Sequence, residues 1–133
     1  VDEDTAAFDK IMAALGMPKG SDEEKAARAA ALEAATLYAT EVPLKTMKAS
    51  LEVFPIVKAM ATEGNPASVS DAGVGVAFCK GALLGASLNV FINTKSMADK
   101  EYAAELNAKA DNMIEVYGKK ADEIFEKVTA RLR

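Results

Sequence analysis

Residues 70–93 read SDAGVGVAFCKGALLGASLNVFIN, and this stretch decides the fold that the sequence predicts. Between Ala72 and Ile92 the only charged residue is Lys80. The length suits a bilayer-spanning helix, but four glycines and a lysine near the middle argue against a membrane span. A soluble helix that is apolar on all sides lies inside a bundle. We therefore predict a buried central helix and no membrane partner.

Small residues recur at every fourth position of this stretch and lead to two asparagines. The row comprises Gly73, Ala77, Gly81, Gly85, Asn89 and Asn93. Residues four apart form one ridge on a helix, and a ridge of small residues lets a second helix approach closely. Burying an amide without partners costs about 1–3 kcal/mol. The two asparagines therefore predict either a hydrogen-bond network between helices or a polar ligand, and both interpretations stay open.

A long helical segment precedes the central stretch. Ser21 and Glu24 form the sequence signature of a capping box, which predicts a helix start there. The pattern then continues over residues 22–63, although Pro43 and Pro55 interrupt it. We expect either one long bent helix or two helices in tandem.

Helical patterns cover the remaining chain as well. Apolar spacing predicts a first helix over residues 4–15. Ser70 is the expected N-cap of the central helix, and Ser96 with Asp99 is expected to cap the last helix. No segment shows the alternation of a strand. The sequence predicts one all-α domain over residues 1–133, a helical bundle whose long bent helices surround a buried Gly/Ala-rich helix.

The composition excludes several classes of site. The chain has no histidine, one cysteine (Cys79) and a net charge of −4. Histidine is the commonest metal ligand and general base, so we expect no metal site, and acid–base chemistry falls to Asp, Glu, Lys or Tyr. A single cysteine allows no disulfide within the chain. No cluster of Lys or Arg stands out, so we expect no nucleic-acid partner.

Distinctive short segments follow one another between residues 4 and 93. In order they are Asp4-x-x-Ala7-Phe8, Met17-Pro18-Lys19, Asp22-Glu23-Glu24-Lys25-Ala26-Ala27-Arg28, Ala39-Thr40-Glu41-Val42-Pro43-Leu44, Gly64-Asn65, Val69-Ser70-Asp71-Ala72-Gly73-Val74 and Ala86-x-Leu88-Asn89-Val90-x-Ile92-Asn93. Each is weak alone, but the ordered set resembles the cyclodeaminase/cyclohydrolase family. That family includes bacterial methenyltetrahydrofolate cyclohydrolase and the cyclodeaminase half of formiminotransferase-cyclodeaminase. The segment 17–28 is more similar to the free-standing bacterial cyclohydrolases.

The resemblance implies a function. It implies a cytoplasmic, homodimeric enzyme that hydrolyses 5,10-methenyltetrahydrofolate to 10-formyltetrahydrofolate, with no cofactor beyond the tetrahydrofolate substrate. Two alternatives are a formiminotetrahydrofolate cyclodeaminase and a non-catalytic helical assembly protein of the same family. The family's N-terminal Pro-Gly-Gly-Gly motif and its Ala/Gly-rich helices have no counterpart here, so we expect this domain to lack those N-terminal helices.

The chemistry of the implied substrate selects candidate residues. Water must add to the carbon of a cationic amidinium, and a carboxylate can attract the cation and accept the proton. Among the positions that resemble the family, Asp4 and Asp71 are the expected catalytic carboxylates. Ser70, Asn89 and Asn93 are the expected substrate-binding residues, because amides and hydroxyls can meet the donors and acceptors of a pterin.

Each candidate also has a purely structural interpretation. Asp71 can favour the start of the central helix through the helix dipole, and Asp4 can be a solvated acid in the first turn. Glu41 is the third candidate carboxylate. Lys80 can anchor the glutamate tail of a folate, or it can extend its charge to the surface.

Overall fold

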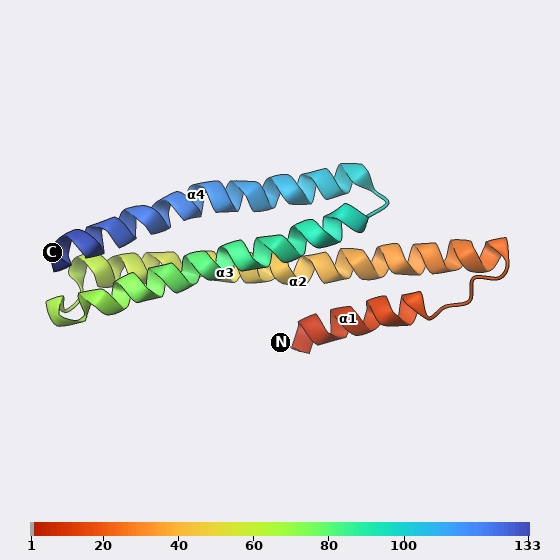
Figure 1. Cartoon of the computed structure of the whole chain (residues 1–133), viewed down its shortest axis with the longest axis horizontal. Helices are drawn as coiled ribbons and strands as arrows, with labels where there is room; N and C mark the ends of the chain where they lie inside the picture. Colours follow the sequence, from red (N-terminus) through yellow and green to blue (C-terminus); the bar gives the residue numbers. More distant parts are fainter. Residues whose placement is uncertain (1) are drawn as a thin grey trace.

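The computed structural model describes residues 2–133, which form four helices without a strand in that range. They are α1 (Asp2–Leu15), α2 (Asp22–Glu63), α3 (Val69–Ser96) and α4 (Lys100–Leu132), with a short 3₁₀ helix, η1 (Pro66–Ser68), before α3. Figure 1 shows an elongated bundle in which each helix runs antiparallel to the next and α1 lies along the first half of α2. The prediction of an all-α bundle is confirmed.

Helix α2 is one continuous helix through both prolines. It begins with the capping box that the sequence predicts. Ser21 Oγ accepts a hydrogen bond from the Glu24 main-chain N–H at 3.1 Å, and Glu24 Oε2 accepts one from the Ser21 N–H at 3.1 Å. These bonds satisfy main-chain donors that no helical carbonyl reaches. Of the two expected arrangements, the single long helix is the one observed.

Helix α3 is the centre of the bundle, because it packs against both α2 and α4. Two clusters of buried apolar residues run along these contacts. One contains the fully buried Met47, Leu83, Val90 and Met97. The other joins Phe54 of α2 to Val76 of α3 and to α4. The placement of the Gly/Ala-rich helix between longer helices agrees with the sequence.

The expectation that α3 is buried on all sides is wrong for this chain. Phe78, Leu88 and Ile92 expose 75%, 67% and 67% of their surface. Only α2 and α4 cover α3 extensively, so an apolar stripe on the remaining face faces outward. By length and composition alone, residues 66–96 could also cross a membrane.

The small-residue ridge of α3 is mostly open as well. A Cβ atom added at Gly73 would lie 2.9 Å from Val128 Cγ1, so this glycine does allow the close approach of α4. A Cβ at Gly81 or Gly85 would meet no atom within 4 Å. The ridge therefore serves helix packing within the chain at one end only.

Two expected caps are placed differently in the structure. Helix α3 begins at Val69, so Ser70 lies inside its first turn; the reason is that η1 leads directly into the helix. Ser96 is the last residue of α3, and Asp99 alone caps α4 by accepting from the Tyr102 N–H at 2.9 Å. The sequence placed both boundaries within a few residues.

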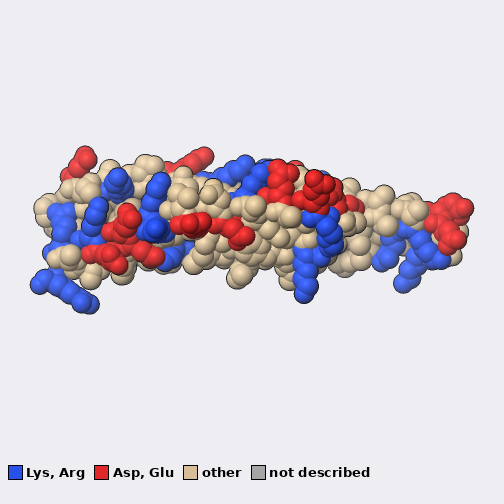
Figure 2. Space-filling model, turned by 90° about the horizontal axis from the view of Figure 1, so that it is seen from above, with Lys and Arg blue, Asp and Glu red and all other residues tan. Residues whose placement is uncertain are grey.

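Charged side chains are spread along the molecule. On the face shown in Figure 2, acidic and basic residues are interspersed over the length of the bundle. Lys80, the single charge between Ala72 and Ile92, forms an ion pair with Asp122 of α4 at 2.5 Å. This pairing ties the middle of α3 to α4.

Candidate functional site

A polar cavity of about 400 Å³ is lined by residues of α1, α2 and α3. Its lining residues are Asp4, Thr5, Ala7, Phe8 and Ile11 of α1, Ala39 and Pro43 of α2, and Asn89 and Asn93 of α3. Three of the five site residues that the sequence indicated are therefore brought together, although they come from positions far apart in the chain. The cavity joins one carboxylate to two amides and contains no Lys or Arg in its lining.

Asn93 is held at this cavity by a bond to α2. Its side-chain Nδ2 donates to the main-chain carbonyl of Ala39 at 3.1 Å. In a regular helix that carbonyl would accept from the N–H of residue 43, but residue 43 is a proline and has no N–H. Asn93 therefore supplies a donor that α2 lacks.

Asn89 and Asp4 are more exposed than Asn93. Asn89 Nδ2 donates to the Gly85 carbonyl of its own helix at 3.2 Å. Asp4 lies in the first turn of α1, and it makes no ion pair with any residue of the described range 2–133. Its neighbour Glu3 instead accepts a hydrogen bond from Lys45 of α2 at 3.0 Å, which raises the pKa of Lys45.

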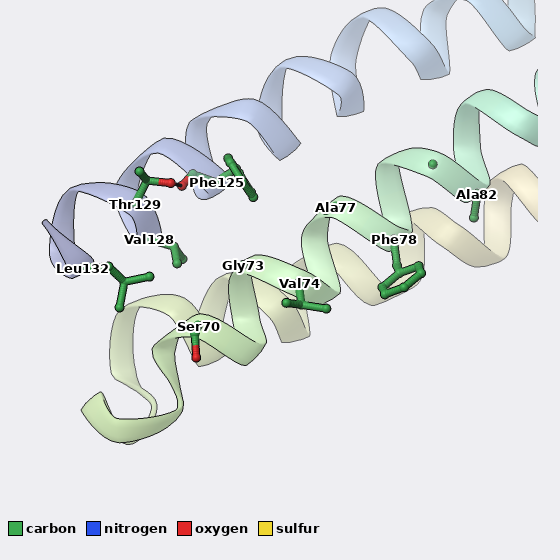
Figure 3. Close-up of a pocket in the computed structure, with 11 residues that line it drawn as sticks. Ser70, Gly73, Val74, Ala77, Phe78, Ala82, Phe125, Val128, Thr129 and Leu132 are labelled. Carbon is green, nitrogen blue, oxygen red and sulfur yellow. Dashed lines mark hydrogen bonds between the residues drawn. The ribbon is translucent and has the colours of Figure 1, made fainter.

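Ser70 and Asp71 lie at the other end of α3. Asp71 is eighteen positions before Asn89 on one helix, which places them about 27 Å apart at 1.5 Å per residue. Ser70 instead lies at one end of an apolar groove of about 750 Å³ between α3 and α4 (Figure 3). Within one chain, neither residue shares the cavity of Asp4 and the two asparagines.

The remaining candidates also lie elsewhere. Glu41 lines a separate hollow between α2 and α4, together with Lys45, Lys48 and Lys109. Lys80 forms an ion pair with Asp122 of α4. Among residues 2–133, no group of three or more His, Cys, Asp or Glu side chains is arranged to hold a metal ion.

Six of the nine cavity residues were not predicted as site residues from the sequence: Thr5, Ala7, Phe8, Ile11, Ala39 and Pro43. Thr5 and Phe8 follow Asp4 on α1, and Pro43 was interpreted only as a helix interruption. Phe8 and Pro43 do belong to segments that carry the family resemblance. Their place in these segments, and the presence of a proline inside a predicted helix, could have indicated from the sequence that they belong to the site.

Comparisons with known proteins show which family this chain belongs to. A sequence model of the formiminotransferase-cyclodeaminase family matches residues 1–112. The methenyltetrahydrofolate cyclohydrolase of Methylorubrum extorquens is 38% identical over 130 residues, which cover 98% of this chain and 62% of that protein. The formimidoyltransferase-cyclodeaminase of Sus scrofa is 30% identical over 131 residues, or 98% of this chain and 24% of that protein.

The chain thus spans about three fifths of the cyclohydrolase and about a quarter of the bifunctional protein. A third relative, the formimidoyltransferase-cyclodeaminase of Dictyostelium discoideum, is 34% identical over 94% of this chain and 22% of its own length. The family match covers well over half of the chain, and the resemblance seen in the sequence is confirmed. This chain belongs to the formiminotransferase-cyclodeaminase family.

Proposed function

We propose that this protein is a methenyltetrahydrofolate cyclohydrolase, which converts 5,10-methenyltetrahydrofolate to 10-formyltetrahydrofolate. The observation that carries the proposal is the cavity that joins Asp4 to Asn89 and Asn93. Its support is the 38% identity to a methenyltetrahydrofolate cyclohydrolase over nearly the whole chain. A cavity lined by a carboxylate and amide oxygens suits a cationic substrate that also carries N–H groups.

In the proposed reaction Asp4 acts as general base. The substrate carbon between N5 and N10 is the centre of an amidinium cation, and the Asp4 carboxylate attracts it. Water adds to this carbon while Asp4 takes the water's proton, which gives a neutral carbinolamine. The C–N5 bond then breaks, N5 becomes an amine, and the formyl group stays on N10. One proton is released overall.

The amides bind rather than react in this scheme. Asn93, which is fixed against α2, and Asn89 contact the pterin ring. Ser70 and Asp71 lie outside the cavity of the same chain, so the proposal gives them no contact with that chain's substrate. No cofactor beyond the folate itself is needed, because hydrolysis of an amidinium involves neither redox nor group-carrier chemistry.

The proposal includes a cytoplasmic homodimer that binds neither nucleic acid nor membrane. Exposed apolar patches of the kind seen on α3 are typical of interaction surfaces, and a two-fold dimer would cover the patch of each copy by the same contact. Interspersed surface charges give no basic stripe on the face seen in Figure 2. Light scattering that finds a monomer at micromolar concentration would contradict the dimer.

A second candidate function is formiminotetrahydrofolate cyclodeaminase. The formimidoyltransferase-cyclodeaminase of Sus scrofa, which is 30% identical over 98% of this chain, supports it. Its reaction releases ammonia and forms 5,10-methenyltetrahydrofolate, which is the substrate of the first reaction, so the same cavity would serve. Ammonia release from 5-formiminotetrahydrofolate distinguishes this candidate from the first.

The test is an assay of 5,10-methenyltetrahydrofolate hydrolysis, in which the loss of substrate absorbance is measured. Asp4→Asn should lower turnover by roughly 10²- to 10⁴-fold, the contribution of a general base. Asp9→Asn is the matched control, since Asp9 is also an exposed carboxylate of α1 but does not line the cavity, and it should retain the parental rate. If neither substitution changes turnover, Asp4 is not the base. A wild-type protein that neither hydrolyses methenyltetrahydrofolate nor releases ammonia from the formimino compound would be a non-catalytic member of the family.

A further inference from the structure

Pro43 leaves an acceptor in the middle of α2 without its helical donor. The carbonyl of Ala39 would be bonded by the N–H of residue 43, and proline has none. Ala39 is only 8% exposed, so water has little access to replace that donor. The side chain of Asn93 donates to this carbonyl from α3 at 3.1 Å, and all three residues line the cavity.

The bond determines which way the Asn93 amide faces. A carbonyl oxygen can only accept, so the amide nitrogen must point to Ala39 and Oδ1 must point away from it. Asn89 is oriented in the same sense by the Gly85 carbonyl. That carbonyl also has the main-chain N–H of residue 89 as its helical donor. The Ala39 carbonyl therefore has the Asn93 amide in place of a helical donor, whereas the Gly85 carbonyl bonds the Asn89 amide in addition to one.

The cavity consequently presents oxygen acceptors. They are the carboxylate of Asp4, the amide oxygens of Asn89 and Asn93, and the hydroxyl of Thr5, which can donate as well as accept. No Lys or Arg lines the cavity. Such a surface selects a ligand edge that carries N–H donors. In a tetrahydrofolate that edge is the 2-amino group with the neighbouring N3–H of the pterin ring.

We propose that Pro43 is a positioning residue for folate recognition: it frees the Ala39 carbonyl to fix Asn93, whose Oδ1 then accepts a hydrogen bond from the donor edge of the pterin. The proposal rests on the proposed function, since it takes the ligand to be a folate. Pro43 itself acts only through Asn93.

The second interior proline of α2 provides a matched control. Pro55 also lacks an N–H, but it lies outside the cavity, and no side chain is bonded to the Leu51 carbonyl that it leaves free within the described range. Pro43→Ala and Pro55→Ala each restore a main-chain hydrogen bond and remove an unfavourable helix residue. Both should raise the thermal unfolding midpoint, by up to roughly 10–15 °C.

The experiment is calorimetric titration of the full chain with 5-formyltetrahydrofolate, alongside thermal unfolding of each variant. Pro43→Ala should weaken binding roughly tenfold, the effect of one lost oriented hydrogen bond, while Pro55→Ala should bind as the parent does. A merely structural role would make stability and binding move together, whereas the proposal has them move in opposite directions. Equal binding by Pro43→Ala and the parent would overturn the proposal.

A double-mutant cycle with Asn93→Ala tests whether Pro43 acts through Asn93. Once Asn93 is removed, Pro43→Ala should have no further effect on binding, and it should restore the stability lost through the unpaired Ala39 carbonyl. A 2-desamino-2-methyl analogue of the folate should bind the parent protein roughly tenfold more weakly than the folate itself does. The Asn93→Ala variant should bind the analogue and the folate with equal affinity. Additive effects in the cycle would overturn the proposal. Absence of any folate binding by the parent would instead refute the proposed function, and this inference with it.

Discussion

The open ridge of α3 makes a prediction about two glycines in the middle of a long helix. Gly81 and Gly85 lie inside a helix of 28 residues, and a Cβ added at either would meet no atom within 4 Å. Glycine in a helix interior is about 0.8–1 kcal/mol less favourable than alanine. Since the new methyl groups neither clash nor become buried, Gly81→Ala and Gly85→Ala should each stabilise the isolated chain by about 0.5–1 kcal/mol.

Gly73 on the same ridge is the matched control. Its added Cβ would lie 2.9 Å from Val128 Cγ1, and Val128 is buried. Overpacking of this kind costs about 1–3 kcal/mol, which outweighs the gain in helix propensity. Gly73→Ala should therefore destabilise the chain by up to about 2 kcal/mol. The three substitutions are chemically identical and differ only in what the structure places beside them.

The assay is thermal unfolding at several protein concentrations. At concentrations where the chain is monomeric, a gain of about 1 kcal/mol corresponds to a rise of roughly 3–6 °C for a domain of this size. If a second copy covers the ridge, the gain for Gly81→Ala and Gly85→Ala should shrink or reverse as the concentration increases. Destabilisation of the monomer by either substitution, to the same extent as by Gly73→Ala, would refute the inference that the ridge is open.

Two further predictions concern stability. Ser21→Ala removes the side-chain acceptor of the capping box of α2 and should destabilise the chain by about 1 kcal/mol in urea unfolding. Ser50→Ala, on the same helix away from its start, is the control and should change stability by less than about 0.5 kcal/mol. Equal effects of the two substitutions would show that the cap is unimportant. Burial raises the pKa of the Cys79 thiol above its usual 9.0, so the unfolded chain loses this proton first and stability should fall as pH rises past that value. The fall in unfolding midpoint between pH 8 and pH 10 should be smaller in Cys79→Ala, and an identical fall would contradict the assignment.

Local signals in the sequence were sufficient for the helices and for part of the cavity. The capping box of Ser21 and Glu24 is a pattern within one turn, and it is formed as expected. The four-residue spacing of Asn89 and Asn93 places both amides on one side of α3, and both line one cavity. These features depend only on helical geometry and on the types of residues involved.

Features that depend on contacts between helices could not be obtained in this way. Asp4 and Asp71 are both acids in the first turn of a helix, and the sequence could not separate them. Only the packing of α1 against α2 brings Asp4 to the asparagines. The apolar composition of α3 likewise indicated that its surface is covered by something, but it could not show that this chain covers only part of it.

Pro43 combines a local sequence signal with a contact between helices. A proline inside a helix is about 3 kcal/mol less favourable than alanine, and departures of this kind from local rules are expected at functional sites. Here the departure has a visible partner, because Asn93 bonds the carbonyl that the proline leaves free. Pro55 breaks the same rule without such a partner and lies outside the cavity. Because the Ala39 carbonyl is nearly buried, a proline at this position requires a donor from elsewhere, and here that donor is the Asn93 amide at the edge of the cavity. Ligand binding by Pro43→Ala therefore distinguishes a proline that serves recognition from one that only bends α2.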